Sequence, residues 1–180
     1  NYGAMTVLGA DTYKLRVGGI IGYLAGGGET TADDINNHGE VTVTHAQGHD
    51  SHVAGIFGSV LAAASLKNSS NSIGGKVFVK GNPGGSNTGG VIGYASYPID
   101  IDNCHNCDSV KINLTTNAQA ILGGIIGYNN TSATKVIKNS SNSGVVFAEG
   151  TISGDGQHIR AGGIFGYCKG GTTLTSLTNS

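Results

Sequence analysis

Gly18-Gly19-Ile20-Ile21-Gly22-Tyr23 is the stretch that decides the fold, because close copies of it return four more times along the chain. The copies read AGIFGS at 54–59, GGVIGY at 89–94, GGIIGY at 123–128 and GGIFGY at 162–167. Their second glycines lie 36, 35, 34 and 39 residues apart, at Gly19, Gly55, Gly90, Gly124 and Gly163. Such spacings are typical of repeats that stack on one another. We therefore expect residues 1–180 to form a single continuous solenoid domain.

A second repeated phrase, centred on asparagine, follows each glycine phrase. It is clearest in Lys138-Asn139-Ser140-Ser141-Asn142 and degenerate in Asp34-Ile35-Asn36-Asn37. A run rich in valine comes next, as in Val41-Thr42-Val43-Thr44. Short β-prone runs between turn residues predict about three strands per repeat. No segment carries apolar residues at helical spacing for three turns with caps, so we expect an all-β fold.

Parallel stacking of such repeats predicts ladders of identical side chains, because equivalent strands lie ~4.8 Å apart. A side-chain amide donates and accepts at once, so stacked asparagines can bond to both neighbours. One predicted ladder comprises Asn68, Asn103, Asn139 and Asn179. The other comprises Asn37, Asn71, Asn106 and Asn142. We expect both ladders to be structural.

The glycine phrase, read as one strand, is apolar on both faces. One face carries Ile20, Ile56, Val91, Ile125 and Ile164, and the other carries Ile21, Phe57, Ile92, Ile126 and Phe165. Such a strand is either covered by a second layer or exposes a stripe to a partner, and the sequence leaves both open. Its three glycines indicate tight bends or close backbone approach. The candidate ligand-binding residues are Tyr23, Tyr94, Tyr128 and Tyr167, which would form a sugar or protein platform if exposed and would otherwise serve in packing.

Composition removes several classes of partner. Charged residues are 12% of the chain against a usual share of about 25%, and the net charge is −1, so we expect no nucleic-acid partner. No apolar run approaches the ~18 residues of a membrane span. The chain starts at Asn1 without a signal peptide, which suggests a mature product or an excised segment. Three cysteines provide no disulfide framework.

The residues with possible chemistry favour a protein without a cofactor. His45, His49 and His52 have a spacing that could supply imidazoles to zinc, but a metal site also needs a closed ligand set, and we predict none. Cys104 and Cys107 form a C-x-x-C, yet Cys104 takes the place of serines in other repeats and is expected to be a small core residue. The few carboxylates do not repeat from coil to coil, so we expect no enzyme. Sequons at Asn68, Asn113, Asn130 and Asn139 leave glycosylation open, with Asn130 the most plausible acceptor.

The phrases G-G-[IV]-[IF]-G-Y and N-[SC]-x-N-x-G, followed by the valine-rich run, resemble the GLUG-motif repeats over essentially the whole chain. Such repeats occur in bacterial adhesin-like surface proteins and as non-catalytic regions of IgA-specific metallopeptidases. The resemblance implies a right-handed parallel β-solenoid of about five coils, with about 35 residues per coil, outside the cell. It implies no catalytic residue. Ala54, Ser59 and the degenerate first asparagine phrase depart from the pattern.

The expected function is that of an extracellular or cell-surface structural and adhesive module. Its expected partners are further copies of itself, another surface protein or a glycan. The alternative is a carbohydrate-binding module, and a glycan-active β-helix enzyme is less favoured. Asn179-Ser180 matches the first half of the asparagine phrase and Asn1-Tyr2-Gly3 its second half, which predicts a segment of a longer array or head-to-tail stacking into a fibre. Recognition is expected in the variable segments 9–16, 45–52, 81–88, 115–121 and 153–160.

Overall fold

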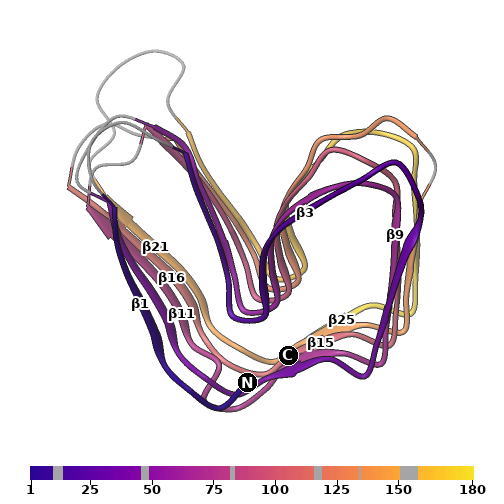
Figure 1. Ribbon diagram of the computed structural model, residues 1–180, viewed down its shortest axis with the longest axis horizontal. Helices are drawn as coiled ribbons and strands as arrows, with labels where there is room; N and C mark the ends of the chain where they lie inside the picture. The colour runs from indigo at the N-terminus through magenta and orange to yellow at the C-terminus, as the bar shows by residue number, and fades with distance from the viewer. Residues whose placement is uncertain (10–13, 46–48, 82–83, 116–118, 134, 151–157) are drawn as a thin grey trace.

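The computed structural model describes residues 1–9, 14–45, 49–81, 84–115, 119–133, 135–150 and 158–180. These residues form 25 strands and no helix. Each pass round the coil adds one strand to each of five parallel sheets, so five coils lie on top of one another (Figure 1). The predicted all-β parallel solenoid is therefore confirmed. Each coil has five short strands where the sequence suggested about three.

We number the sheets in the order in which the chain enters them. Sheet 1 contains β1 (Met5–Gly9), β6 (Val41–His45), β11 (Val77–Gly81), β16 (Val110–Leu114) and β21 (Val146–Gly150). Sheet 2 contains β2 (Leu15–Gly18), β7 (Ser51–Ala54), β12 (Gly85–Gly89), β17 (Gln119–Gly123) and β22 (Ile159–Gly162). Sheet 3 contains β3 (Ile21–Ala25), β8 (Phe57–Leu61), β13 (Ile92–Ala95), β18 (Ile126–Asn129) and β23 (Phe165–Cys168).

The last two sheets complete the coil. Sheet 4 contains β4 (Thr30–Asp33), β9 (Ala64–Lys67), β14 (Ile99–Asp102), β19 (Lys135–Lys138) and β24 (Thr172–Thr175). Sheet 5 contains the two-residue strands β5 (Asn36–Asn37), β10 (Ser70–Asn71), β15 (His105–Asn106), β20 (Ser141–Asn142) and β25 (Thr178–Asn179).

Seen along the stack, the coil is heart-shaped, because sheets 2 and 3 run into its middle and back out as a V (Figure 1). The V separates two cores. The first core belongs to sheets 1 and 2 and is built largely of valine, including Val41, Val43, Val53, Val77 and Val79. The second core belongs to sheets 3, 4 and 5 and is built largely of isoleucine, including Ile56, Ile92, Ile101, Ile125 and Ile137.

The glycine phrase forms the point of this V and is not one straight strand. β2 ends at Gly18 and β3 begins at Ile21, so the phrase closes a strand of sheet 2, bends and opens a strand of sheet 3. A β-carbon at Gly19 would lie 2.7 Å from Asn37 Oδ1, which only glycine avoids. Both apolar columns predicted for opposite faces therefore pack in the second core, where Ile125 and Ile126 are buried together. In the middle coils of the solenoid, the glycine phrase therefore exposes no apolar stripe.

Buried asparagines of sheet 5 support the point of the V. Asn37 Nδ2 donates to Asn71 Oδ1 at 2.9 Å, and the same bond continues through Asn106 and Asn142 at 2.8 and 2.6 Å. The second amide hydrogen of each donates to a carbonyl of its own turn, as from Asn71 to Gly75 O at 2.6 Å. The ladder thus satisfies both hydrogens of each buried amide.

The position of Asn179 corrects the sequence prediction. Asn179 pairs with Asn142 in sheet 5 and accepts its amide hydrogen at 2.8 Å, so it belongs to the second ladder and not to the first. Ser176 takes the first-ladder place, since it shares the left-handed φ of Asn68, Asn103 and Asn139. Asn1 donates to Asn37 Oδ1 at 3.0 Å and occupies the same place in its repeat as Asn179. Asn179-Ser180 therefore matches the second half of the asparagine phrase.

The first ladder is only partly continuous. Asn103 Nδ2 donates to Asn68 Oδ1 at 2.9 Å, whereas Asn139 Nδ2 donates to the Asp102 carboxylate at 2.8 Å. These residues share a left-handed backbone conformation, with φ of 49°, 55° and 53° for Asn68, Asn103 and Asn139. Asparagine tolerates this conformation better than most residues. The first ladder is mainly a column of bends.

Candidate groove site

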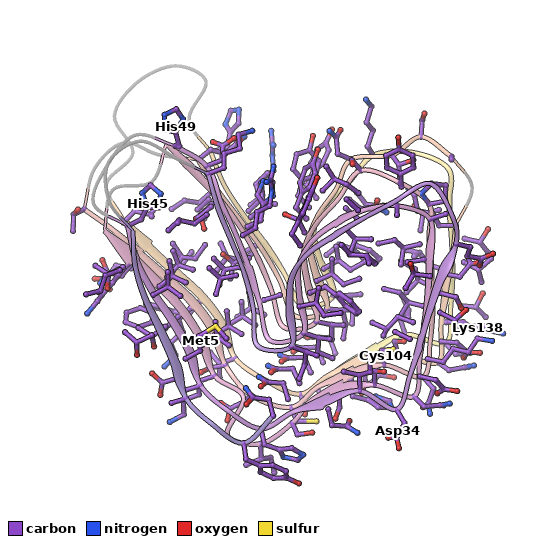
Figure 2. The ribbon with its side chains drawn as sticks, viewed as in Figure 1. Met5, Asp34, His45, His49, Cys104 and Lys138 are labelled. Atoms are coloured by element: carbon purple, nitrogen blue, oxygen red, sulfur yellow. The ribbon has the colours of Figure 1, made fainter. Side chains whose placement is uncertain are left out.

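The outer faces of sheets 2 and 3 face each other across the V and form a groove along the stack. Figure 2 shows side chains from both walls projecting into this V. In register, the sheet 2 wall presents Arg16, His52, Asn87, Ile121 and Arg160. The sheet 3 wall presents Tyr23, Ser59, Tyr94, Tyr128 and Tyr167. The structure therefore brings the four predicted tyrosines to one wall of a groove.

The tyrosine rings are packed mainly against other side chains. Tyr94 and Tyr128 meet edge to face at 5.5 Å between ring centroids, and Tyr128 and Tyr167 do so at 5.0 Å. Arginines from the opposite wall lie over Tyr23 and Tyr167, with the Arg16 guanidinium carbon 4.4 Å from the Tyr23 ring centre. Burial raises the pKa of Tyr128. Because ring faces are used in packing, the middle of the column offers hydroxyl groups rather than an open stacking surface.

His52 fills the gap that Ser59 leaves in the tyrosine column. Its ring stacks on Tyr94 with 4.3 Å between centroids, and its Nδ1 lies 2.6 Å from Ser59 Oγ. Burial, and then the positive charges of Lys14 and Arg16, lower the pKa of His52 to about 3. The imidazole is therefore neutral in ordinary conditions. The sequence flagged Ser59 as a departure, but the compensating His52 was not recognised.

A pocket of about 270 Å³ lies in this groove. Its polar lining includes Lys14, Asp50, Asn87, Gln119 and Asn130, together with the hydroxyl groups of Tyr94 and Tyr128. Asn130 bridges these hydroxyls: its Nδ2 donates to Tyr94 OH at 3.0 Å, and Tyr128 OH donates to its Oδ1 at 3.1 Å. The plausible glycan acceptor Asn130 thus has its amide engaged in the groove wall.

Part of the pocket lining comes from the variable segments in which recognition was predicted. Lys14, Asp50, Asn87 and Gln119 belong to four of them, and these parts fold as the outer half of the groove wall. Residues 10–13, 46–48, 82–83, 116–118 and 153–157 of the same segments lie outside the described residues. Of the pocket residues, only Tyr94 and Tyr128 were predicted to bind a ligand, whereas His52 and Asn130 were considered as a metal ligand and a glycan acceptor. The only signal available was variation between repeats.

The three histidines do not converge. His45 is buried beside the first core, whereas His52 faces the groove, and Figure 2 shows His45 and His49 at separate points of the coil. Within the described ranges, no three histidine, cysteine or acidic side chains gather in a group that could hold a metal ion. Neither ring nitrogen of His45 has a hydrogen-bond partner within the described residues.

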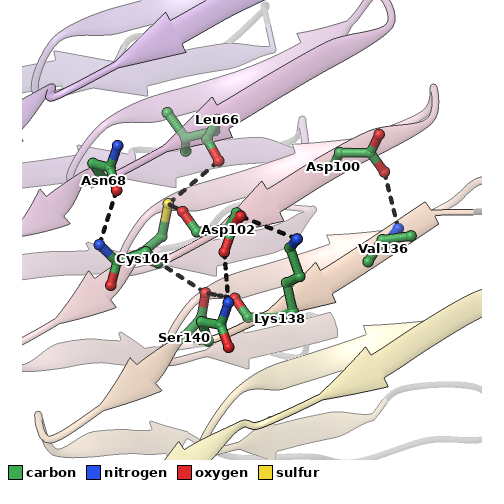
Figure 3. A network of polar contacts seen from close by, with 10 residues as sticks. Leu66, Asn68, Asp100, Asp102, Cys104, Val136, Lys138 and Ser140 are labelled. Atoms are coloured by element: carbon green, nitrogen blue, oxygen red, sulfur yellow. Dashed lines mark hydrogen bonds and ion pairs between the residues drawn. The ribbon is translucent and has the colours of Figure 1, made fainter.

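Cys104 is a buried core residue. Its Sγ lies 3.6 Å from the carbonyl oxygens of Leu66 and Asp102, in the place where Ser140 Oγ donates to Lys138 O at 2.8 Å (Figure 3). Burial raises the pKa of its thiol to about 11, so the reactive thiolate is suppressed. Cys104, Cys107 and Cys168 are free thiols.

The outer face of sheet 4 carries an alternating charge ladder. The register aligns Asp33, Lys67, Asp102 and Lys138 in successive coils. Lys138 Nζ lies 3.2 Å from Asp102 Oδ2, and the Asn139 hydrogen bond, followed by Lys138, lowers the pKa of Asp102 (Figure 3). Asp33 and Asp102 therefore do share a column, contrary to the sequence expectation. Lysines separate them, so they do not form the facing carboxylate pair used in glycoside hydrolysis.

Comparison with protein-family models, characterised proteins and solved structures yields no match for this chain. Within the described residues, no helix is long and apolar enough to cross a membrane.

Proposed function

We propose that the chain is a structural and adhesive repeat module of a secreted or surface protein, as its resemblance to GLUG repeats suggests. The observation that carries the proposal is the groove between sheets 2 and 3, which runs along a stack held by a buried asparagine ladder. A stiff stack suits a scaffold. A groove along it gives a ligand contacts on several coils at once, which raises avidity without new contacts at any one coil.

The contrast between the two faces of sheet 2 supports recognition in the groove. Core-facing positions are mostly aliphatic, as at Val17, Val53 and Leu122. Groove-facing positions change chemically from coil to coil, through arginine, histidine, asparagine, isoleucine and arginine. Packing alone would favour repetition on both faces, because equivalent residues stack on one another. The outer column of sheet 4 varies too, so such variation marks positions that the core does not constrain, and a binding surface needs positions of this kind.

Self-association belongs to the same proposal. Strands β1 to β5 and β21 to β25 each have a partner strand on one side only. An unpaired strand edge is a template for another strand. End-to-end stacking of copies would continue all five sheets and lengthen the groove.

Location and adhesion are tested separately. Antibodies against the chain should label intact cells of its source organism, with a cytosolic protein as the negative control. The purified chain should bind a mucin-coated surface, and Gln119→Trp, which fills the groove pocket, should remove that binding. Asn113→Trp makes the same change on the outer face of sheet 1 and should leave binding intact. Labelling only after permeabilisation would contradict the location, and equal binding by both variants would contradict the groove.

A further inference from the structure

Asn87 is an unpaired amide in the wall of the groove. The residue is only 9% exposed, yet its side chain makes no hydrogen bond within the described part of the chain. Its register neighbours do not satisfy it, since Ile121 is apolar and His52 Nδ1 is engaged by Ser59. Its amide atoms are not fully enclosed, because Asn87 lines an open pocket in which solvent can act as the hydrogen-bond partner. The amide is therefore available to a ligand in the pocket.

Other hydrogen-bonding groups of the pocket are also unused. The Gln119 side chain has no partner within the described residues and lines the same pocket. Tyr94 OH accepts a hydrogen bond from Asn130, which leaves its own proton available to donate. Together these groups offer two amides and one hydroxyl. An amide can donate to one hydroxyl oxygen and accept from the next, which matches adjacent hydroxyl groups on a ring.

The charges of the pocket are only partly paired. Lys14 Nζ lies 3.6 Å from Asp50 Oδ2, so the rim carries opposite charges close together. The Arg16 guanidinium lies over the Tyr23 ring. A β-carbon at Gly85 would lie 2.9 Å from Asp50 Oδ1, so the Asp50 carboxylate fits there because residue 85 has no side chain. Arg16 lines the pocket without an ion-pair partner among the described residues, so one positive charge is unmatched, and a neutral sugar is inferred from the free amides and not from the charges.

We propose that this pocket, lined by Asn87, Gln119, Tyr94, Asn130, Lys14 and Asp50, binds one neutral hexopyranose unit of a glycan through its hydroxyl groups. Its volume of about 270 Å³ is slightly below the ~300–1,000 Å³ of pockets for drug-sized ligands, which suits a single ring. Neighbouring units of the glycan would extend along the groove. The inference deepens the proposed adhesive role, since it names the ligand of the same groove.

The test is an NMR titration with the methyl glycosides of glucose, galactose and mannose. At least one glycoside should shift the amide resonances of β12 and β17, and Asn87→Ala should weaken that binding about tenfold. The same substitution should leave the melting temperature unchanged or raise it, because the amide has no partner to lose. Asn113→Ala, on the outer face of sheet 1, should change neither property, and Gly85→Ala should weaken binding by displacing Asp50.

Any of four results would overturn the assignment. The first three are the absence of shifts with all three glycosides, unchanged affinity in Asn87→Ala, and a clear fall in melting temperature for Asn87→Ala, which would give the amide a structural role. Tighter binding of methyl glucuronide than of the neutral glycosides would also overturn it, in favour of an acidic sugar. If no glycoside binds while intact cells are labelled and mucin is bound, the ligand assignment alone fails. If a glycoside binds but labelling requires permeabilisation, the proposed location alone fails.

Discussion

A single backbone conformation explains the first asparagine column. One residue per coil between sheets 4 and 5 has φ near 50°, and the five are Asp34, Asn68, Asn103, Asn139 and Ser176. Asparagine and aspartate enter this region most readily, because their short polar side chains bond locally. The sequence predicted asparagine at a bend. It misassigned the fifth coil because Asn179 resembles the motif, whereas the geometry needs a left-handed residue three positions earlier.

Ser176 is the least suited residue in this column, so Ser176→Asn should stabilise the protein. We expect a gain of about 0.5–1 kcal/mol in the free energy of unfolding, since the left-handed conformation costs an ordinary residue roughly 1–2 kcal/mol. Thermal or urea unfolding measures the change. Thr175→Asn, one residue earlier and without positive φ, is the matched control and should gain nothing. Equal effects of the two substitutions would contradict a conformational origin.

His52 should make stability fall in mild acid. Its pKa is about 3 in the folded protein and 6.5 when unperturbed, so the unfolded chain takes up the proton first as pH falls. The contribution of neutral His52 is therefore complete above about pH 6.5 and declines towards pH 3, by about 2 kcal/mol at about pH 5. Unfolding measured at about pH 7.5 and about pH 5 should show this loss in the parent. His52→Gln should remove it, while the exposed His158→Gln should retain it; the same loss in both variants would exclude His52 as its source.

At the scale of elements, strand type and repeat length were predictable and the V was not. Valine-rich runs such as 41–44 alternate at period two and fold as sheet 1 strands. In the glycine phrase the same alternation concealed a bend, because Gly18 and Gly19 are compatible with either a weak strand or a turn. A β-carbon at Gly19 would lie 2.3 Å from Gly55 O and 2.7 Å from Asn37 Oδ1, and no sequence pattern records that these phrases come so close. The bend, and the groove beside it, could therefore not be predicted.

The second ladder should be the most sensitive polar element of the fold. Asn71 donates to Asn106 Oδ1 and Gly75 O and accepts from Asn37 Nδ2, all within the protein interior. Asn71→Ala leaves these three groups unpaired, which should cost about 2–4 kcal/mol of unfolding free energy. Asn113→Ala, on the outer face of sheet 1, should stay within about 0.5 kcal/mol. Similar losses in a urea titration of both variants would mean that the ladder contributes little.

At the scale of the whole molecule, stability should vary along the stack rather than across it. Interior coils have hydrogen-bonded neighbours on both sides, whereas the first and fifth coils have one neighbour each in this chain. In repeat proteins, stability is approximately a sum of repeat terms and interface terms. The terminal coils lack one interface and should open at lower free energy than the middle coil.

Hydrogen exchange can measure this gradient and test self-association in one experiment. In dilute solution, amides of β11 to β13 should exchange at least about tenfold more slowly than those of β21 to β25, because opening the middle coil breaks two interfaces. If copies stack end to end, raising the protein concentration should slow exchange in β1 to β5 and β21 to β25 and leave β11 to β13 unchanged, because stacking supplies the missing interface only at the ends. Slower exchange in sheets 2 and 3 of every coil would instead indicate association through the groove. Terminal coils whose exchange does not depend on concentration would rule out end-to-end stacking.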